Sequence, residues 1–441
     1  MMTAVKIIGG GLAGSEAAWQ LLKRGIPVCL YEMRPAVSTE VHKTDKLGEL
    51  VCSNSLGSSA ATSASGLLQE ELQALDSLIM KAALKFSVPA GKALAVDREK
   101  FSDFITDTLL QNPLFELKRE EITEIPDENC IIASGPLTSP ALAEKLQKLL
   151  GGNYLYFYDA VAPVIELGSV DMNIAYRRDR YADYEGGDYI NCPMDRSQYM
   201  KFYEALISAE RAQLHNFENN AKYFEGCMPV EVIASRGVDT LRFGPLRPVG
   251  LSDPRSGNHP YAVVQLRQDN QEGTLYNIVG FQTNLRWKEQ ERVFRLIPGL
   301  EHAEFVRFGV MHRNIYVNAP QCLDEYLRPR GQEKLFLAGQ ITGVEGYLES
   351  TAMGLLAGLN MCQRLSGREL LSWPPESAIG ALLFRLHDAT NTKFNPVNAN
   401  MGIFPELHEK IKGRKERNLE LLRRGRNAFS AFIRSESEIL G

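Results

Sequence analysis

The chain has 441 residues, of which 44% are hydrophobic and 23% are charged, and its formal net charge is −5 at pH 7. A chain of this length can bury a sizeable core and has room for two or three domains. The net negative charge excludes a protein that is basic all over, so any nucleic acid would have to contact a local basic patch. No run approaches the roughly 18 apolar residues of a membrane span, and we expect no membrane partner. The first residues already enter a strand, which leaves no room for a signal peptide.

The seven cysteines are an odd number and are scattered along the chain. They show neither C-x-x-C pairs nor the spacing of metal ligands, so we predict no metal site. This usage suits a reducing cytoplasm, where each cysteine is either core filler or a reactive thiol.

A glycine motif follows the first predicted strand, which begins at Val5. Its three glycines occupy the three glycine positions of G-x-G-x-x-G. The first permits a tight turn, the second lets the backbone approach a pyrophosphate, and the third lets the next helix pack on the strand. The start of that helix offers N–H groups and a positive dipole end to phosphates. The predicted binding residues of this turn are Gly9, Gly10, Gly11, Leu12, Ala13 and Gly14.

The elements after the motif complete a dinucleotide-binding unit. We expect a helix from Ala13 to Arg24 and a second strand from Val28 to Tyr31. Glu32 follows that strand, where a carboxylate can accept hydrogen bonds from the ribose hydroxyls. Two strands, a helix and a terminal acid in register favour a bound dinucleotide over a purely structural glycine turn.

A long polar segment follows Glu32. Its thirty-odd residues are rich in Ser, Thr and Gly, too many for an idle connection, so we expect a functional loop around Cys52, Ser53 and Asn54. The pattern beyond it predicts further elements of the same α/β domain. These are a helix from Leu67 to Leu84, a strand and a helix with Asp97 as N-cap, a strand from Phe115 to Ile125, and a buried strand that begins at Asn129.

From about residue 154 to residue 313 the sequence changes character, because aromatic residues become dense and Pro and Gly interrupt short strand-like runs. Helices are expected from Arg196 to Ala212 and from Lys288 to Leu296, with two strands at 261–268 and 275–283 joined by a turn. We therefore predict an α/β protein with a Rossmann-type domain that resembles glutathione reductase. This domain is discontinuous, at 1–153 and 314–441, with an inserted α+β domain at 154–313 that would hold the substrate.

A second glycine cluster discriminates between cofactors. A buried strand from Lys334 to Ala338 precedes it, and a helix from Tyr347 to Leu365 follows. In flavoproteins of the two-dinucleotide type such a segment returns to the flavin, whereas it has no fixed duty in a nicotinamide enzyme. An ordinary strand-to-helix turn is the alternative. A second G-x-G-x-x-G is absent, so a nicotinamide would dock transiently. The predicted flavin contacts are Gly339, Gln340, Gly343 and Gly346.

The C-terminal extension, from about residue 367, carries a basic stretch. Residues 409–426 hold eight Lys or Arg against three Glu. Such a stretch is usually a solvated helix face, but in a net acidic protein it is also an economical place for phosphate contacts. The candidates are Arg423, Arg424 and Arg426, with alternative patches at Arg177, Arg178 and Arg180 and at Arg286, Lys288 and Arg292.

Several longer motifs point to one family. TDKLGELVCSNSLG, SVPAGKALAVDR, FEGCMPVEV, GVMHRN, LAGQITGVEGYLES and NANMGIF are distributed over the whole chain. With the N-terminal glycine motif, they resemble the folate- and FAD-dependent tRNA (uracil-5-)-methyltransferases. The related flavoproteins that modify wobble uridine share the glycine-rich motifs but carry a further C-terminal helical domain, for which this chain is too short.

The resemblance implies a reaction at uridine 54 of the tRNA T-loop. The carbon would come from 5,10-methylenetetrahydrofolate and the electrons from FAD reduced by NAD(P)H. Carbon 5 of uracil is a poor nucleophile until a group such as a thiolate adds at carbon 6, and a base must then remove the carbon 5 proton. The resemblance assigns these duties to Cys52 and Cys227. Our preference for the nucleophile is Cys227, although the sequence does not decide between them.

Other site residues rest on the same resemblance. His312 could stack on a pterin or polarise it, and Arg313 could hold a folate carboxylate. Ser53 and Asn54 are expected near the substrate. One departure concerns Gly57, because the family usually has a basic residue at this point of its SNS motif. If that residue contacts phosphate or folate, this chain must supply the charge elsewhere.

Alternative functions remain open from the residues. One is the same chemistry on an rRNA uridine or on a wobble uridine, and another is oxidation of a small molecule by the flavin. The oligomeric state is not predicted.

Overall fold

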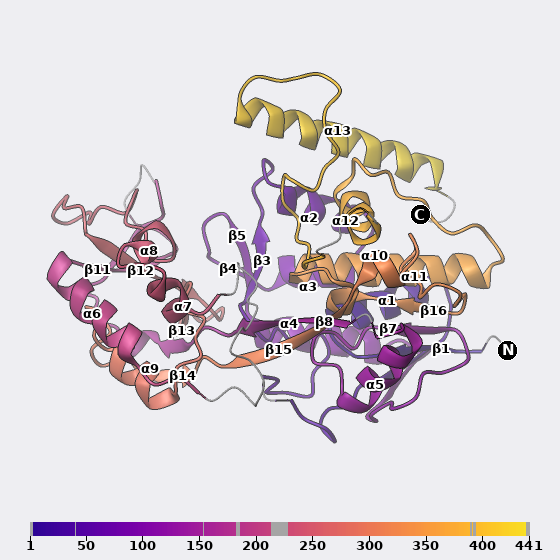
Figure 1. Cartoon of the computed structure of the whole chain (residues 1–441), viewed down its shortest axis with the longest axis horizontal. Coiled ribbons are helices and arrows are strands. Elements are labelled where there is room, and N and C mark those ends of the chain that lie inside the picture. Colours follow the sequence, from indigo (N-terminus) through magenta and orange to yellow (C-terminus); the bar gives the residue numbers. More distant parts are fainter. Residues whose placement is uncertain are drawn as a thin grey trace.

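The protein is described by a computed structural model (Figure 1). The structure describes residues 3–39, 41–152, 154–181, 186–212, 228–388, 390 and 394–437. At residues 154–159, 312 and 313 it describes the backbone alone.

A five-stranded parallel sheet forms the centre of the first domain. Its first two strands were predicted by their apolar runs, and the motif between them forms the predicted helix α1 (Leu12–Lys23). Parallel strands in non-sequential order require crossovers, which defines a Rossmann-type α/β fold and confirms the predicted class. The strand order is β16 (Leu335–Leu337), β7 (Cys130–Ile132), β1 (Val5–Ile8), β2 (Val28–Tyr31) and β6 (Phe115–Lys118).

Helix α1 packs against α11 (Tyr347–Leu365), although more than 300 residues separate them in the chain. A Cβ atom added at Gly354 would overlap the backbone of Ala13, and one at Gly358 would lie 2.9 Å from the carbonyl oxygen of Ala17. The two glycines therefore permit the close approach of the helices, which holds the second glycine cluster beside the first.

The single helix predicted from Leu67 to Leu84 is wrong. The structure has two helices, α2 (Ala64–Ala74) and α3 (Leu78–Lys85). Asp76 breaks the pattern with a φ of 59°, and the Ser77 hydroxyl then accepts a hydrogen bond from the backbone of Met80. The helical spacing of apolar residues continues across this break, so the spacing alone does not reveal that Ser77 caps a new helix.

The loop around Cys52 contains a strand that was not predicted. This strand, β3 (Ser55–Ser58), pairs with β5 (Ala93–Val96), which also pairs with β4 (Ser87–Val88). Helix α4 (Arg98–Leu110) begins after Asp97, whose side chain accepts a hydrogen bond from the backbone of Lys100, so the predicted N-cap is confirmed. Helix α5 (Pro140–Leu149) follows β7.

The segment between the two halves of the Rossmann-type domain contains a six-stranded antiparallel sheet. The predicted hairpin is confirmed, because Gln268 pairs with Tyr276 across the turn. The sheet order is β10 (Tyr176–Arg177), β11 (Ile190–Met194), β12 (Ala262–Gln268), β13 (Leu275–Ile278), β9 (Val164–Glu166) and β14 (Phe305–Arg307). Its helices are α6 (Arg196–Ser208), α7 (Val230–Ser235), α8 (Thr240–Phe243) and α9 (Trp287–Phe294).

Two separate hydrophobic clusters underlie this arrangement. One combines residues 5–150 with residues 316–432, and the other lies within residues 165–303. An antiparallel pair, β8 (Tyr154–Ala160) and β15 (Met311–Val317), leads into and out of the second cluster (Figure 1). The boundaries at 153 and 314 stay a prediction.

The C-terminal extension covers one side of the first domain. Helix α10 (Ala319–Cys322) contacts α12 (Ala378–His387), and α13 (Arg414–Ser435) lies across α2 at the outer surface (Figure 1). Within the described part of the chain, no helix combines the length and apolar character needed to cross a membrane.

Candidate functional site

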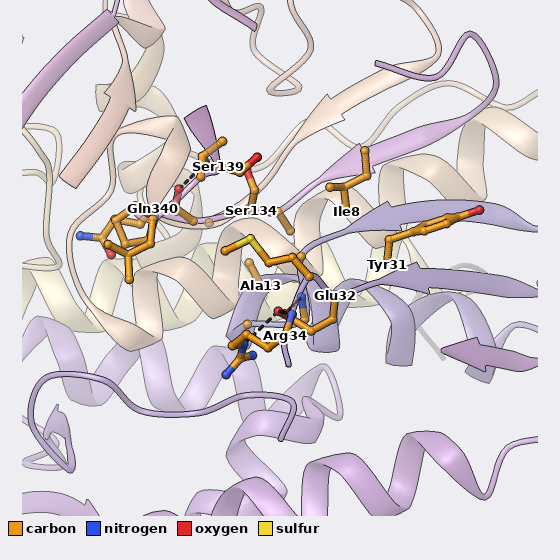
Figure 2. Close-up of a pocket in the computed structure, with 18 of the residues that line it drawn as sticks. Ile8, Ala13, Tyr31, Glu32, Arg34, Ser134, Ser139 and Gln340 are labelled. Atoms are coloured by element: carbon orange, nitrogen blue, oxygen red, sulfur yellow. Dashed lines mark hydrogen bonds and ion pairs between the residues drawn. The ribbon is translucent and has the colours of Figure 1, made fainter. Parts of the chain in front are cut away.

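The glycine motif forms one wall of a cavity (Figure 2). Gly9 has a φ of 105°, and a Cβ atom there would overlap the backbone of Ala133. A Cβ atom at Gly14 would overlap the Gly9 carbonyl oxygen, whereas one at Gly11 would find no atom of the described chain within 4 Å apart from its own neighbours in sequence. Gly9 and Gly14 are therefore needed for packing inside the protein. Gly11 instead keeps open space, which is the place that a pyrophosphate requires.

The N-terminus of α1 faces this space without a side-chain cap. Its N-cap residue is Gly11, which makes no capping hydrogen bond, and no acidic residue lies in the first turn. The first N–H groups of a helix need acceptors, and the positive end of the helix dipole favours an anion. The helix terminus is thus suited to a phosphate group.

The cavity is built from the ends of three neighbouring strands and the returning segment. Residues 133–139 follow β7, which is the direct parallel neighbour of β1, and Gly339 and Gln340 follow β16. In Figure 2, Tyr31 and Gln340 lie at opposite ends of the cavity. The predicted cofactor residues that line it are Gly9, Gly10, Gly11, Leu12, Ala13, Glu32, Gly339 and Gln340.

Glu32 lies in the cavity wall and is already hydrogen-bonded. One carboxylate oxygen accepts from the backbone of Gly10 at 2.9 Å, and the other accepts from the Arg34 backbone and guanidinium. Burial alone would raise the pKa of Glu32, but the hydrogen bonds and charge of Arg34 outweigh it and hold the pKa below its usual value. These contacts use three of the roughly four acceptor positions of a carboxylate, so Glu32 retains capacity for one ribose hydroxyl.

The remaining glycines of the predicted cofactor set shape turns outside the cavity lining. Gly343 has a φ of 95° and packs against the Phe394 ring, and Gly346 has a φ of 123° before α11 begins. Gln340 donates a hydrogen bond of 2.5 Å to Glu345, which fixes the turn between them. Left-handed conformations at these positions favour glycine, so the two residues position Gly339 and Gln340.

Cys52 lies beside the cavity, held by backbone contacts. Its N–H donates to the Tyr347 hydroxyl at 2.8 Å, and that hydroxyl donates to the Ser53 carbonyl oxygen at 3.0 Å. The thiol is half-buried and lies 3.6 Å from the carbonyl oxygen of Ala160, to which it can donate. Tyr347 and Val51 both line the cavity. The thiol is therefore presented where the first domain meets β8.

Asn54 joins this loop to the inserted segment. Its amide group donates to the carbonyl oxygens of Val96 and Gln268, and its oxygen accepts from Arg267 at 3.1 Å. The side chain is fully buried, and both amide hydrogens are used within the protein. The Ser53 hydroxyl accepts from the backbone of Ser55.

A buried ion pair reinforces the same contact. Arg98 donates from Nε to both carboxylate oxygens of Asp269, at 3.2 and 3.1 Å, and also to the carbonyl oxygens of Leu50 and Cys52. Burial alone would lower the pKa of Arg98, but the charge of Asp269 raises it above the usual value. The ion pair fixes the cysteine loop against the β12–β13 hairpin.

Three other predicted site residues have little or no described side-chain structure. Cys227 lies outside the described residues. His312 and Arg313 lie in β15, where their backbones pair with Asp159 and Tyr158 of β8, and their side chains are outside the described structure.

The predicted arginines of α13 all have protein partners. Arg423 forms an ion pair with Glu420, and Arg426 forms one with Glu70 of α2. Arg424 donates to the carbonyl oxygens of Pro405 and Glu406. These contacts hold α13 on the domain surface.

Sequence reasoning missed several residues of the site. Arg34 follows Glu32 by two positions, and the polar group Ser134, Thr138 and Ser139 follows the strand adjacent to β1. The signal was available, because the ends of adjacent parallel strands meet at one edge of a sheet. Gly57 has a φ of 84°, and a Cβ atom there would lie 2.5 Å from the Ser65 hydroxyl, which explains why glycine suits that position.

The fold and the cavity together define a dinucleotide-binding protein of the Rossmann type with a half-buried cysteine beside the cavity. Residues 4–369 match the family described as glucose inhibited division protein A. A protein of Listeria innocua named methylenetetrahydrofolate--tRNA-(uracil-5-)-methyltransferase TrmFO is 55% identical over 97% of this chain and 98% of its own. A protein of Heliobacterium modesticaldum with the same name is 56% identical over 97% of this chain and 98% of its own.

A solved structure shares the fold. Aquifex aeolicus GidA has a TM-score of 0.70 and 17% identity, over 98% of this chain and 73% of that chain. The chain therefore belongs to the glucose inhibited division protein A family, and within it to the group of folate-dependent tRNA (uracil-5-)-methyltransferases.

Proposed function

We propose that the protein methylates carbon 5 of uridine 54 in the tRNA T-loop. The carbon comes from 5,10-methylenetetrahydrofolate, and the electrons come from FAD that NAD(P)H has reduced. The single observation that carries this proposal is the position of Cys52. Tyr347 holds this thiol beside a cavity that has the features of a dinucleotide site. The names of relatives at 55% identity over nearly the whole chain support the substrate class.

The cavity residues fit FAD in their chemistry. The open space at Gly11 and the uncapped start of α1 suit its pyrophosphate, and Glu32 suits the adenosine ribose. Gly339 and Gln340, at the far end, would contact the flavin portion. Bound FAD would supply the reducing electrons of the reaction. NAD(P)H would dock transiently, because the sequence holds one G-x-G-x-x-G motif.

Two thiols would divide the chemistry on uracil. One thiolate adds to carbon 6, which makes carbon 5 nucleophilic, and it leaves again when the proton at carbon 5 is removed. We assign the addition to Cys227 and the proton transfer to Cys52. Tyr347 and Arg98 fix the backbone of Cys52 and so orient its thiol.

The folate and the RNA would contact both domains. His312 and Arg313 lie on β15, which pairs with the strand that carries Ala160, the partner of the Cys52 thiol. We propose that they bind the pterin and a folate carboxylate, with Ser53 nearby. The six free cysteines in the described part of the chain are compatible with a reducing compartment such as the cytoplasm.

The test is an assay on unmodified tRNA transcript with labelled methylene carbon in the folate. We expect label in the T-loop uridine. If the FAD-loaded protein transfers label to no RNA, the proposal is wrong. If label appears in rRNA alone, the substrate is an rRNA uridine and not tRNA. Cys227→Ala and Cys52→Ala should keep FAD and lose turnover. Cys322→Ala, whose thiol does not line the cavity, is the matched control.

The basic C-terminal segment would add phosphate contacts. Each contact with a phosphate steepens the salt dependence of binding. Neutralising Arg423, Arg424 and Arg426 should flatten the slope of log Kd against log salt. An unchanged slope removes α13 from the RNA-binding surface.

A further inference from the structure

A second hollow lies beside the cysteine loop and shares Val51 with the cavity described above. Its cavity volume is about 280 Å³. Val51 directly precedes Cys52, so the cysteine is the next residue in the chain after one that lines the hollow. The lining combines the cysteine loop with β14, the segment after it, and the start of α9. The residues are Val41, Lys43, Val51, Val161, Trp287, Val306, Arg307, Phe308 and Val310.

One wall of the hollow belongs to a stack of three aromatic rings. Trp287 stacks on Phe308 with ring centroids 5.4 Å apart and planes 12° apart, and Phe308 stacks on Phe305 at 5.4 Å and 11°. Phe305 is partly buried against the core of the inserted segment, which anchors the stack. Trp287, at the outer end, is 60% exposed, whereas Trp373 is 6% exposed. The stack thus ends in a tryptophan ring that is open to a further flat ring.

Positive charge surrounds this ring. Lys43 and Arg307 line the hollow, and Lys288 is exposed next to Trp287. Within the described part of the chain, the side chains of Lys43, Lys288 and Arg307 form no hydrogen bond or ion pair. Arg307 is the most enclosed of them. Burial together with the charge of Arg98 lowers its pKa, although the charges of Asp269 and Glu49 act in the opposite direction. A partly buried cation without a partner favours an anionic ligand.

The lining also discriminates between ligands. Among the residues that the structure describes, it contains two cationic side chains but no carboxylate or carboxamide. The amino-pyrimidinone edge of a pterin calls for hydrogen-bond acceptors, which this lining does not supply from side chains. A nucleotide matches better, because its base offers a flat face for stacking and its phosphate offers a negative charge.

We propose that this hollow binds one unpaired nucleotide of the RNA, next to the reacting uridine, with its base on Trp287 and its phosphate on Arg307 and Lys43. The inference rests on the proposed function, and it adds a substrate subsite that positions the RNA. The short chain distance between Val51 and Cys52 places this nucleotide beside the one at the thiol. Splayed bases stacked on aromatic side chains are the common way in which proteins hold single-stranded RNA.

The experiment measures binding of unmodified tRNA transcript to the FAD-loaded protein. A stacked base contributes about 1–3 kcal/mol, so Trp287→Ala should raise Kd by roughly 5- to 150-fold. Trp287→Phe should restore part of the affinity. Lys43→Ala should flatten the slope of log Kd against log salt by about 0.7, the value for one single-strand phosphate contact. Phe243→Ala is the matched control, because Phe243 is 84% exposed in α8 and does not line the hollow.

Measurements made without RNA test whether Trp287 acts on RNA binding alone or also on the flavin. FAD content and flavin reduction by NAD(P)H in the absence of RNA should be the same in Trp287→Ala and wild type. Unchanged Kd for tRNA in Trp287→Ala overturns the inference. A raised KM for methylenetetrahydrofolate with unchanged RNA binding also overturns it, because the ring would then hold a pterin.

Failure of the proposed function would look different. In that case the wild-type protein would transfer no label to RNA. A loss of RNA affinity in Trp287→Ala would still support the subsite. If the wild type transfers label to RNA and Trp287→Ala binds tRNA with wild-type affinity, the proposed function stands and the proposed nucleotide subsite is wrong.

Discussion

The Tyr347 hydroxyl connects α11 to the cysteine loop, because it accepts a hydrogen bond from the Cys52 N–H at 2.8 Å and donates one to the Ser53 carbonyl oxygen at 3.0 Å. These two residues are 295 positions apart in the chain. The hydroxyl thus fixes two consecutive peptide groups at the thiol.

Tyr347→Phe should therefore keep FAD but lower the methyl-transfer rate. Two hydrogen bonds of about 1 kcal/mol each are lost, so a fall in kcat of up to roughly 30-fold is expected from the misplaced thiol. The measurement is single-turnover transfer of labelled carbon. Tyr326→Phe, whose ring lies outside the cavity lining, is the control. A wild-type rate in Tyr347→Phe would mean that the loop is held by other contacts.

Gly11→Ala should weaken FAD binding without destabilising the fold, whereas Gly14→Ala should destabilise the fold. A methyl group at Gly11 meets no atom of the described residues within 4 Å apart from its chain neighbours. The free energy of unfolding of the FAD-free protein should therefore change by less than about 0.5 kcal/mol. The methyl group would occupy the pyrophosphate space, and we expect at least a tenfold weaker Kd for FAD. In Gly14→Ala the methyl group would overlap the Gly9 carbonyl, so the fold itself should be destabilised. FAD titration and urea unfolding of both variants check this, and equal FAD affinity in Gly11→Ala and wild type contradicts it.

Removing one partner of the Arg98–Asp269 ion pair should be costly. Both side chains are buried, and Arg98→Met leaves the Asp269 carboxylate without its partner. A loss of about 3–5 kcal/mol in the free energy of unfolding is expected. The double variant Arg98→Met with Asp269→Leu should recover part of this loss, because no buried charge remains. Glu210→Gln breaks an exposed ion pair with Arg286 and should change the stability by less than about 1 kcal/mol. Similar losses in Arg98→Met and Glu210→Gln would refute the argument.

Glu349 should make the stability fall as pH rises from 4.5 to about 7. Burial raises the pKa of this carboxyl from 4.5 to about 7, against the opposing effect of the hydrogen bond from the Ala399 N–H. Between these pH values the folded protein holds a proton that the unfolded chain has released, so stability is fully present below the unfolded pKa and is lost as pH passes the folded pKa. The loss is at most about 3.5 kcal/mol, since each pKa unit corresponds to about 1.4 kcal/mol.

Glu349→Gln mimics the protonated side chain and keeps an oxygen for the Ala399 N–H. Its free energy of unfolding should therefore differ less between pH 5 and pH 8 than that of the wild type. Urea unfolding at both pH values measures this difference. Glu166→Gln, at an exposed residue, should behave like the wild type. The same pH dependence in Glu349→Gln as in the wild type would show that another group titrates.

Local patterns determined much of the Rossmann-type domain from the sequence alone. The strands β1 and β2, the helix between them and the Asp97 cap depend on residues close together in the chain, and all were predicted. The Gly9 to Gly14 turn and Glu32 were placed for the same reason, because the motif encodes its own geometry. The break at Asp76 was missed, since a cap inside an apolar period leaves the period intact.

Only the tertiary structure decided how distant segments meet. The contacts of Tyr347 with Cys52, of Arg98 with Asp269 and of Trp287 with the hollow beside Val51 bring together residues that are 171 to 295 positions apart. No local pattern encodes such contacts, because they arise when separate elements pack together and bury charges and rings against one another. The sequence by itself therefore determined the dinucleotide-binding unit and the candidate thiols. The packing of the inserted segment against the cysteine loop decided what surrounds Cys52.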